Sequence, residues 1–471
     1  MPNLSAVYLS NYLMKRGLEV DYINLFQHEK ATLARMLQED PVCVAITTTF
    51  YVVNLPVTEI VEFVRQYNKT VPIIVGGVLV SNHQNAFGEE EFLGALRDMG
   101  GDIFVLESQG EATLGRLIEQ LKAGGDLAEV PNIVYQKDGK QYMTPAVKEN
   151  NPLDENAIDW RLFRHKNLGP TIQTRTARSC AFECAFCGYP QRGGALTLAS
   201  LDTVANELEA MRSLGNVKNV VFIDDTFNVP KARFKDFCRM LIERDFQFNW
   251  FSYYRCDHGD EEAIELMRKS GCKGVFLGLE SGSQEILVKM NKRAKVQNYE
   301  KGIKGLKENG ITTFVSLITG YPGETEDTIK ETLDFLVANK PDYWRTQIWY
   351  CDPLTPVYKN RREEFGIVGE GFKWRHNTMD SMTAADCIEE MFLQIDDSVS
   401  TWLPQYSFNF WILPYVLGKG VSLPALKKFM VGANKMLALE IATLDKQTKQ
   451  FHQKQLLDEL MHSVRPKLSL V

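Results

Sequence analysis

The run Arg178-Ser-Cys180-Ala-Phe-Glu-Cys184-Ala-Phe-Cys187-Gly188 decides how the rest of this sequence is interpreted. It places three cysteines in a CxxxCxxC spacing within one short stretch. Clusters of the [4Fe–4S] type are held by cysteine thiolates, and the cube has four corners. Three thiolates therefore predict a cluster in which one iron stays open to a small molecule.

Two other interpretations of these thiols stay open. A free cysteine is often a packed apolar side chain, and structural zinc usually takes four ligands from two CxxC-like pairs. The other cysteines stand singly and supply no second pair; they are Cys43, Cys238, Cys256, Cys272, Cys351 and Cys387. The spacing therefore favours a cluster over zinc or simple packing.

Length and composition indicate a large protein with ample cores. The chain has 471 residues, of which 44% are hydrophobic and 24% charged, so two or three domains are expected. A net charge of −7 argues against nucleic acid as the main partner. Cysteines without paired spacing suit a reducing, cytoplasmic setting, and we expect neither a signal peptide nor a membrane span.

Residues 1–125 alternate between helical and strand patterns. Helices are expected over 4–16, 57–67 and 111–123, and strands over 19–25, 42–47, 73–75 and 103–106. Strands that alternate with helices predict a parallel, doubly wound α/β sheet, which binds its ligand outside the carboxyl ends of the strands.

Hydroxyl groups and glycines follow three of these strands. The residues at these strand ends are Thr47, Thr48, Thr49, Val75, Gly76, Gly77, Gly110 and Glu111. Hydroxyls can hydrogen-bond a polar cofactor tail, and glycines let the backbone approach a ring closely. Each feature alone is also ordinary turn chemistry. Their order ahead of the cysteine run favours a ligand site.

Residues 126–170 are interpreted as a linker containing a small strand pair, and residues 171–357 as a second α/β domain. Six strands are expected there, over 171–176, 220–223, 250–255, 274–278, 312–318 and 342–349. The helices between them are expected over 201–214, 231–244, 261–269, 299–309 and 325–338. Six βα units predict a partial, open (β/α) barrel with its chemistry at the carboxyl ends of the strands.

Candidate binding residues stand at those strand ends. They are Asp224, Asp225, Arg255, Glu280, Ser281, Ile318 and Gly320. Taken singly, Asp and Ser before a helix are usually caps. Several such endings, in order behind a three-cysteine loop, favour one shared site.

The last segment, residues 358–471, is helical and aromatic. Its marked residues are Trp374, His376, Trp402, Tyr406, Phe408, Phe410, Trp411 and Tyr415. Aromatic side chains in such a stripe are more often core than substrate cage, and we expect His376 to be a surface or capping residue. The segment is predicted to act as a lid that closes the mouth of the barrel.

The cysteine run, with Phe186 before its last cysteine, resembles the signature of the radical S-adenosylmethionine (SAM) superfamily. The resemblance implies that Cys180, Cys184 and Cys187 hold a [4Fe–4S] cluster. It also implies that the amino and carboxylate groups of SAM chelate the open iron and that Phe186 lies beside the adenine. The further SAM contacts that it implies are Asp224 and Asp225 near the amino group, Arg255 at the carboxylate, Glu280 and Ser281 near the ribose and carboxylate, and Ile318 and Gly320 at the adenine.

Residues 1–125 resemble the cobalamin-binding domain of B12-dependent radical SAM enzymes. The resemblance implies that the strand-end residues from Thr47 to Glu111 named above contact cobalamin. No Asp-x-His-x-x-Gly stretch is present, and methylases of this type generally lack one, so cobalt is expected to have no histidine ligand. Relatives place a strand before the first helix, so we expect the sheet here to lack its first strand.

The order of motifs along the chain resembles the PhpK-type radical SAM P-methyltransferases. The segments that carry this resemblance are Ile223-Asp-Asp-Thr-Phe-Asn228-Val-Pro230, Arg255-Cys-Asp-His-Gly-Asp260, Trp349-Tyr-Cys-Asp352-Pro353 and His376-Asn-Thr-Met-Asp380. The archetype methylates phosphorus in a phosphinothricin precursor.

That resemblance implies a reaction. A reduced cluster would split SAM to a 5′-deoxyadenosyl radical, which would take hydrogen from a P–H group of a small-molecule phosphinate. The substrate radical would then take methyl from methylcobalamin. A reductase or a donor of the flavodoxin or ferredoxin type would supply electrons. Three alternatives stay open: a C-methyltransferase acting on another small molecule or peptide, a radical SAM enzyme without cobalamin, and a noncatalytic iron–sulfur or zinc protein.

Overall fold

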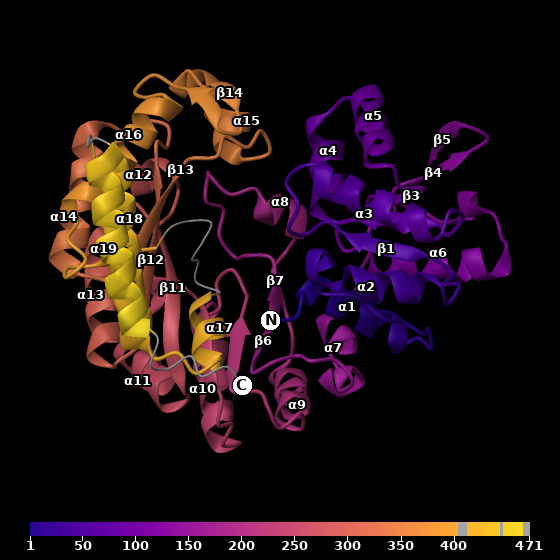
Figure 1. Cartoon of the computed structure of the whole chain (residues 1–471), viewed down its shortest axis with the longest axis horizontal. Helices are drawn as coiled ribbons and strands as arrows, with labels where there is room; N and C mark the ends of the chain where they lie inside the picture. Colours follow the sequence, from indigo (N-terminus) through magenta and orange to yellow (C-terminus); the bar gives the residue numbers. More distant parts are fainter. Residues whose placement is uncertain (404–411, 443–445, 465–471) are drawn as a thin grey trace. The chain divides into compact units, whose positions relative to one another are not determined.

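The computed structural model describes residues 1–403, 412–442 and 446–464 (Figure 1). Contacts divide the chain into two compact units. The N-terminal unit consists of Pro2–Lys166 with Leu198–Ala210, and the C-terminal unit of Met1, Asn167–Thr197 and Met211–Val471. The aromatic residues Tyr406, Phe408, Phe410 and Trp411 singled out in the sequence lie outside the described residues.

The N-terminal unit is built on a five-stranded sheet whose strands lie in sequence order. They are β1 (Val44–Thr47), β2 (Ile73–Gly76), β3 (Ile103–Val105), β4 (Ile133–Lys137) and β5 (Lys140–Met143). Strands β1, β2 and β3 pair in parallel, and β4 and β5 extend the sheet in antiparallel fashion. The parallel part is the doubly wound sheet expected from the sequence, with β1 at its edge.

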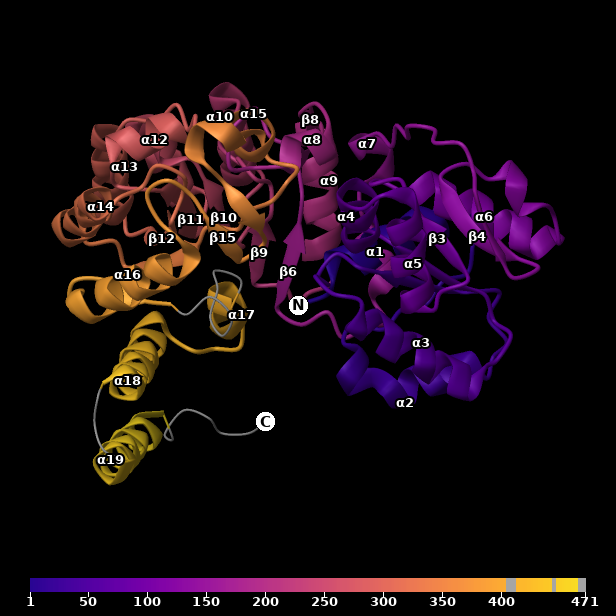
Figure 2. The same cartoon turned by 90° about the horizontal axis from the view of Figure 1, so that it is seen from above.

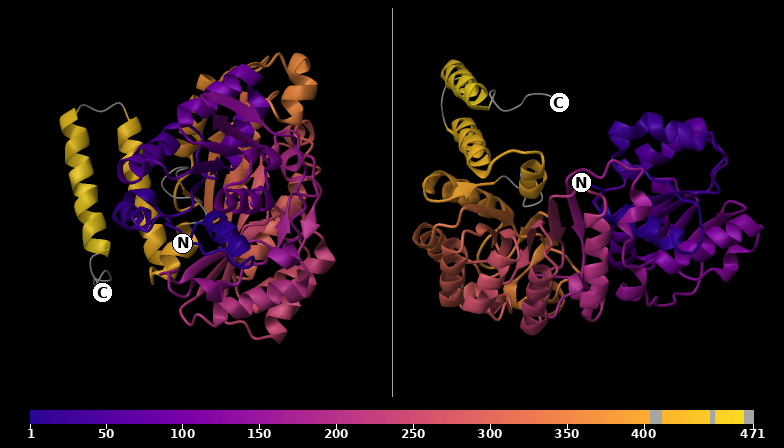
Figure 3. Two further views of the ribbon diagram at one scale, coloured as in Figure 1. Left: turned by 90° about the vertical axis from the view of Figure 1, so that its right-hand side faces the viewer. Right: turned by 90° about the horizontal axis from the view of Figure 1, so that it is seen from below.

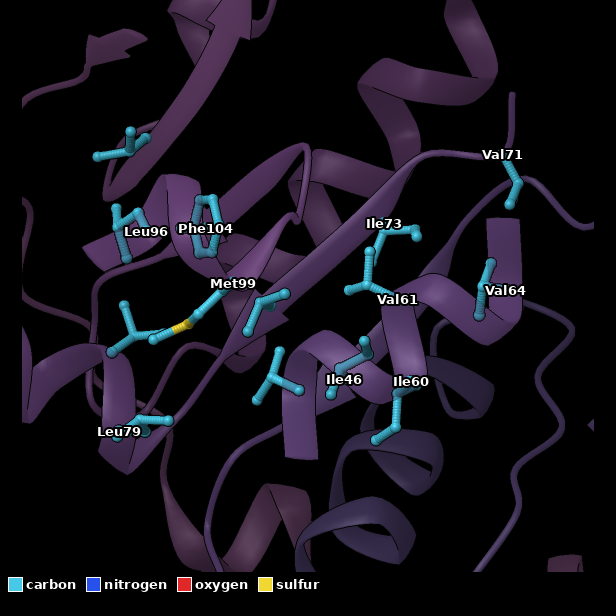
Figure 4. Packing of buried hydrophobic residues seen from close by; sticks show 14 of the residues in the cluster. Ile46, Ile60, Val61, Val64, Val71, Ile73, Leu79, Leu96, Met99 and Phe104 are labelled. Atoms are coloured by element: carbon cyan, nitrogen blue, oxygen red, sulfur yellow. The ribbon is translucent and has the colours of Figure 1, made fainter. Parts of the chain in front are cut away.

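Helices cover both faces of this sheet. They are α1 (Leu4–Met14), α2 (Phe26–Leu37), α3 (Leu55–Tyr67), α4 (Val78–Ala86), α5 (Glu89–Met99), α6 (Glu111–Ala123) and α7 (Leu153–Asn156). On one face Val61 of α3 and Met99 of α5 pack in one core with Ile73 and Phe104 of the sheet (Figure 4). On the other face side chains of α1 and α6 form a second core. Burial on both faces explains why β2 and β3 are continuous apolar runs.

The strand expected over residues 19–25 is absent, and that prediction was wrong. Backbone N–H groups need hydrogen-bond partners, and here those of Asn24 and Leu25 donate to the carboxylate of Glu29 at 2.6 Å each. A strand-like composition therefore forms no strand where the side chain of Glu29 satisfies the backbone.

Residues 126–170 are more than a linker. They contribute β4 and β5 to the sheet, and Glu149 accepts hydrogen bonds from the backbone N–H groups of Ala112 and Thr113, at 2.9 and 2.7 Å. Glu149 thereby supplies acceptors for N–H groups in the first turn of α6, which have no partner within the helix. Residues 126–166 therefore belong to the N-terminal unit, and residues 167–170 belong to the C-terminal unit.

The C-terminal unit is built on a seven-stranded parallel sheet in the order β16-β13-β12-β11-β10-β9-β6. The strands are β6 (Thr171–Thr174), β9 (Asn219–Phe222), β10 (Asn249–Tyr254), β11 (Cys272–Glu280), β12 (Thr312–Thr319), β13 (Tyr343–Ile348) and β16 (Thr401–Trp402). Six of these are the strands predicted for the partial (β/α) barrel. The seventh, β16, comes from the C-terminal region and was not predicted.

Helices connect these strands (Figure 2). They are α10 (Lys231–Glu243), α11 (Glu261–Lys269), α12 (Gln284–Lys289), α13 (Val296–Glu308) and α14 (Glu326–Asn339). The helix expected over 201–214 is α9 (Leu201–Arg212), and most of it belongs to the N-terminal unit. There Trp160 Nε1 donates to Glu207 Oε1 at 3.0 Å.

The C-terminal region is mostly helical, as expected. Its elements are α15 (Pro356–Phe365), the hairpin of β14 (Val368–Glu370) and β15 (Lys373–Arg375), α16 (Ser381–Gln394), α17 (Ile412–Gly418), α18 (Leu423–Ile441) and α19 (Lys446–Val464). Helices α18 and α19 lie side by side (Figure 3). No helix within the three described stretches has both the length and the apolar character that crossing a membrane requires.

Candidate cofactor and substrate sites

The three cysteines of the sequence motif lie in one loop after β6 and the short strand β7 (Ala177–Arg178), before α8 (Tyr189–Gly193). The loop is held from outside, because Ala185 N–H donates to the carbonyl of Met290 at 2.8 Å and its carbonyl accepts from Val357 N–H at 2.9 Å. Cys184 is buried, and Cys180 and Cys187 are half-buried. The loop thus presents three thiols from a braced backbone.

Burial and neighbouring charges change the pKa values of the Cys184 and Cys187 thiols, and only the thiolate form binds a metal. Burial raises the pKa of the Cys184 thiol, and the nearby Lys292 and Arg255 oppose that shift. Burial also raises the pKa of Cys187, to about 11, with Cys184 and Cys180 adding to it. The three sulfurs therefore lie within electrostatic reach of one another. Iron bound there would supply the positive charge that favours thiolates.

The donor set fits a [4Fe–4S] cluster. Three thiols from one loop match three corners of a cube. Among residues 1–403, 412–442 and 446–464, no three His, Cys, Asp or Glu side chains are grouped so as to hold a metal ion. Three thiolates would complete the protein ligands of such a cluster, whereas structural zinc usually takes a fourth protein ligand.

Arg255 lies at the end of β10, as predicted, but its guanidinium is already engaged. It forms a two-bond contact with the carboxylate of Asp257, 3.0 Å at each oxygen, and Nη2 donates to the carbonyl of Lys292 at 2.6 Å. Its guanidinium carbon also lies 3.8 Å from the ring centroid of Phe182 in the cysteine loop. These contacts indicate that Arg255 positions the cysteine loop; its pairing with the SAM carboxylate stays a prediction.

Lys292 links two of the predicted SAM contacts. Its ammonium lies 2.9 Å from Glu280 Oε1 and 5.5 Å from the ring centroid of Phe186. Glu280 follows a register shift in the pairing of β11 with β12 and has a positive φ of 69°. The preceding Gly278 makes room, because a Cβ there would lie 2.7 Å from the Glu280 carboxylate. Lys292 was not among the residues predicted from the sequence, because nothing near it in the sequence marks Glu280, twelve residues away, as its partner.

The two aspartates after β9 differ. Asp224 is buried and accepts from Thr176 N–H and Oγ1 and from Ala177 N–H, at 2.6, 2.5 and 2.9 Å. Burial raises its pKa. Asp225 is solvent-exposed, yet desolvation by the surrounding protein and then the charge of Asp224 raise its pKa to about 7. Asp224 therefore organises the strand ends, and Asp225 is the carboxylate that a ligand can reach.

At the end of β12 the predicted adenine-contacting segment is tightly built. Ile318 is buried, and Gly320 has a φ of 85° and donates its N–H to Glu324 at 2.5 Å. Its carbonyl lies 3.1 Å from Nε2 of His376, whose ring stacks on Trp374 with centroids 5.1 Å apart. His376 is buried, so the expectation of a surface or capping residue was wrong.

Ser281, predicted to contact SAM, is buried, and its hydroxyl hydrogen-bonds groups of the surrounding turn. Its hydroxyl lies 3.2 Å from Thr332 Oγ1 and accepts from Ser283 N–H at 3.0 Å. These contacts match the turn and cap chemistry that was the alternative interpretation. These contacts shape the loop after β11, and the contact of Ser281 with SAM stays a prediction.

In the N-terminal unit β1 and β2 bring the threonine and glycine loops together. Thr48 is fully buried; its Oγ1 donates to the Gly76 carbonyl at 3.0 Å and accepts from Leu79 N–H at 3.1 Å. Gly77 has a φ of 110°, and a Cβ there would lie 3.0 Å from Thr48 Oγ1. Thr48 is thus structural, whereas Thr47 and Thr49 flank it, half-buried, with their hydroxyls 3.1 Å apart.

Among the other residues predicted to contact cobalamin, the side chains of Val75 and Glu111 are buried. The side chain of Val75 is fully buried in the core. Gly110 has a φ of 60° and precedes α6. Glu111 is buried and accepts from Asn151 Nδ2 at 2.9 Å, so its carboxylate is tied to residues 149–151. Any ligand contact from Val75 would have to come from its backbone.

Comparison with known proteins agrees with this division of the chain. The model of the radical SAM superfamily matches residues 174–336, and the model of the B12 binding domain matches residues 1–104. The chain combines a B12-binding domain with a radical SAM domain. The cofactors that these domains imply are a [4Fe–4S] cluster, SAM and cobalamin. The expected fold class and cofactors are thereby confirmed, and an enzyme is indicated, while the individual contact residues stay predictions.

The proteins that this chain is similar to include several methyltransferases. An uncharacterized methyltransferase of Pyrococcus horikoshii is 25% identical over 432 residues, covering 89% of this chain and 90% of the relative. The hopanoid C-3 methylase of Methylococcus capsulatus is 23% identical over 329 residues, covering 67% of this chain and 60% of that protein.

Two solved structures resemble the whole chain. The radical SAM methyltransferase TsrM from Kitasatospora setae, with cobalamin and a [4Fe–4S] cluster bound, has a TM-score of 0.68 at 17% identity and covers 98% of this chain and 97% of its own. The cobalamin-dependent SAM radical enzyme OxsB, with aqua-cobalamin bound, has a TM-score of 0.67 at 18% identity, covering 98% and 73%. At these identities the likeness shows the shared fold.

Proposed function

We propose that this protein is a cobalamin-dependent radical SAM methyltransferase that methylates the phosphorus of a phosphinate-type natural-product precursor. The observation that carries the methyltransferase part is the braced three-thiol loop at one end of a parallel (β/α) sheet, in a chain that also has a B12-binding domain. The phosphorus part rests on the order of motifs along the chain, which resembles that of the PhpK-type enzymes.

When bound, the cluster supplies an electron that splits SAM, and cobalamin supplies the methyl group. The chain's own residues bind and orient. Cys180, Cys184 and Cys187 hold iron, and the Lys292–Glu280 pair sets a charged, buried edge beside Phe186. Asp225 offers an accessible carboxylate for the SAM amino group.

The C-terminal hairpin is suited to excluding water. Trp374 Nε1 donates to the carbonyl of Trp349 at 2.7 Å, and the stacked His376 reaches the carbonyl of Gly320. These contacts tie β15 and the residue that follows it to the ends of β12 and β13. A reactive radical needs such closure, because solvent would quench it.

Phosphorus is a chemically reasonable acceptor for this cofactor set. A polar methyl transfer needs a nucleophile, and a P–H phosphinate is barely one. Radical chemistry removes that requirement. Carbon is the second candidate acceptor, because relatives include the hopanoid C-3 methylase and the tryptophan 2-C-methyltransferase of Streptomyces laurentii. We further propose a reductase, or a donor of the flavodoxin or ferredoxin type, as the source of electrons.

The experiment is product analysis with labelled SAM. Anaerobically reconstituted protein with cobalamin would be given trideuteriomethyl SAM, a reductant and a P–H phosphinate, and the product followed by mass spectrometry and phosphorus NMR. We expect the P–H coupling to disappear as a labelled P–methyl group forms. Label on carbon would replace the phosphorus assignment with C-methylation. Absence of 5′-deoxyadenosine, when the cluster is intact, would refute the radical SAM activity itself.

A further inference from the structure

One face of the sheet in the C-terminal unit carries an aromatic row. Parallel register aligns Tyr253, Phe276, Phe314 and Tyr343 across β10 to β13. The ring centroids of Tyr253 and Phe276 are 4.9 Å apart, and those of Phe276 and Phe314 are 5.1 Å apart. Phe314 and Tyr343 belong to a core closed by side chains of α17 and α18. We call these four residues the aromatic floor.

Arg345 lies one layer above this floor, toward the carboxyl ends of the strands. Register places it beside Ser316 of β12, which in turn pairs with Gly278 of β11. Residues two positions apart on a strand face the same side, so this layer shares the face of the aromatic floor. In (β/α) barrels this direction leads to the chemistry.

Among the described residues, the guanidinium of Arg345 has rings and a hydroxyl around it but no counter-ion. Nε donates to Ser316 Oγ at 3.3 Å, and the guanidinium carbon is 5.2 and 5.7 Å from the ring centroids of Phe276 and Phe314. Within the described parts of the chain no carboxylate lies within ion-pair distance of it. Glu280 is the carboxylate whose charge it feels, and that group is bound to Lys292 at 2.9 Å.

The positive charge of the Arg345 guanidinium is therefore not neutralised by the described residues, and its surroundings are largely apolar. Burial lowers the pKa of Arg345, but an arginine stays protonated at neutral pH. Removing a cation from water is costly unless an anion or several acceptors compensate, and the two rings and one hydroxyl compensate only in part. Arg345 and the next residue on its face, Gln347, are only partly buried, so a solute can reach them.

We propose that Arg345 binds the anionic group of the methyl-accepting substrate, a phosphinate or a carboxylate, and that the partly buried rings of Tyr253 and Phe276 contact the apolar part of that substrate. Both anions present two oxygens that match the fork of a guanidinium. This inference rests on the proposed function. The family resemblance assigns the carboxylate of SAM to the open iron, so the anion at Arg345 belongs to a second molecule.

The first test measures binding and not turnover. Reconstituted protein would be titrated with phenylphosphinate and, separately, with its neutral ethyl ester, observed by phosphorus NMR line broadening. We expect the wild type to bind the anion in preference to the ester, and Arg345→Met to bind the anion about tenfold more weakly or worse, the size of a charge-assisted contact. The exposed Arg244→Met is the matched control and should bind as wild type does.

Arg345→Lys keeps the charge but loses the fork. It should still prefer the anion over the ester, with weaker affinity, and it decides the matter if the methionine variant does not fold. Equal binding of the anion by wild type and Arg345→Met, or no preference for the anion in wild type, overturns the proposal.

The second test separates this inference from the proposed function. SAM cleavage without substrate, under dithionite, should be the same in Arg345→Met as in wild type at every SAM concentration. If the variant needs more SAM, Arg345 belongs to the SAM site and the proposal fails. If the wild type itself makes no 5′-deoxyadenosine, the proposed function fails, while the binding comparison still decides whether Arg345 is an anion site.

Discussion

Replacing Lys292 with methionine should strip the cation from a buried ion pair beside the cysteine loop. Lys292 Nζ lies 2.9 Å from Glu280 Oε1, and the two side chains are only 8% and 12% exposed. Methionine retains a flexible unbranched chain that can fill the same space. The substitution therefore changes mainly the charge, and it leaves the Glu280 carboxylate buried without its partner.

The size of the effect follows from this geometry. Breaking a buried pair on one side costs about 3–5 kcal/mol, because the remaining charge keeps its desolvation penalty. With a urea m-value of about 3 kcal/mol per molar, the unfolding midpoint should fall by roughly 1–1.7 M. The double variant Lys292→Met with Glu280→Gln should recover most of this loss, since it leaves no lone charge.

Tryptophan fluorescence suits the assay, because five of the six tryptophans in the described residues belong to the C-terminal unit, in which the pair lies. Urea unfolding of cluster-free wild type, single variant and double variant would give the three midpoints. An unchanged midpoint in the single variant, or a double variant no more stable than the single one, would refute the reasoning. If Glu280 also contacts SAM, the double variant should regain stability but not SAM cleavage.

Cys184→Ala should abolish both the cluster and SAM cleavage, measured as bound iron and 5′-deoxyadenosine; cleavage that persists would exclude Cys184 as a ligand. Gly77→Val should weaken cobalamin retention by gel filtration and visible spectra while sparing cluster assembly, because its Cβ would lie 3.0 Å from Thr48 Oγ1, and Gly88→Val, with open space, is the control. Glu324 is buried, and burial raises its pKa from 4.5 to about 8, so the folded state resists its ionisation and stability should fall as pH rises from about 4.5 to 8. Glu324→Gln should flatten that part of the pH profile of the urea midpoint, and parallel profiles for the two proteins would contradict the assignment.

Buried parallel strands were predictable because their chemistry is local. A strand covered by helices on both faces must be apolar along its whole length, and β2 and β3 carry that pattern between helices. The two-residue strand β16 is too short to leave a pattern. Residues 19–25 have a strand-like composition, yet composition cannot report whether a side chain such as Glu29 will take the backbone N–H groups instead.

In the candidate site, too, the sequence indicates which residues are present, and only the fold shows which partners they have. Asp224 and Asp225 are neighbours with the same side chain, but Asp224 is saturated by Thr176 and Ala177 whereas Asp225 is exposed. Arg255 lies against Phe182 of the cysteine loop, and Arg345 lies beside Ser316 of β12. Only the folded chain shows that Asp257 neutralises the first and that the described residues offer the second no carboxylate.

The sequence by itself determined the cysteine loop, the order of strands and helices, and the two kinds of domain, because spacing within one loop and periodicity along one element are set by covalent connectivity. The tertiary structure alone decided which charges are neutralised and which remain for a ligand. Lys292 and Glu280, or Arg345 and Ser316, meet through turns and sheet register. Such pairings depend on distances between segments that no local spacing encodes.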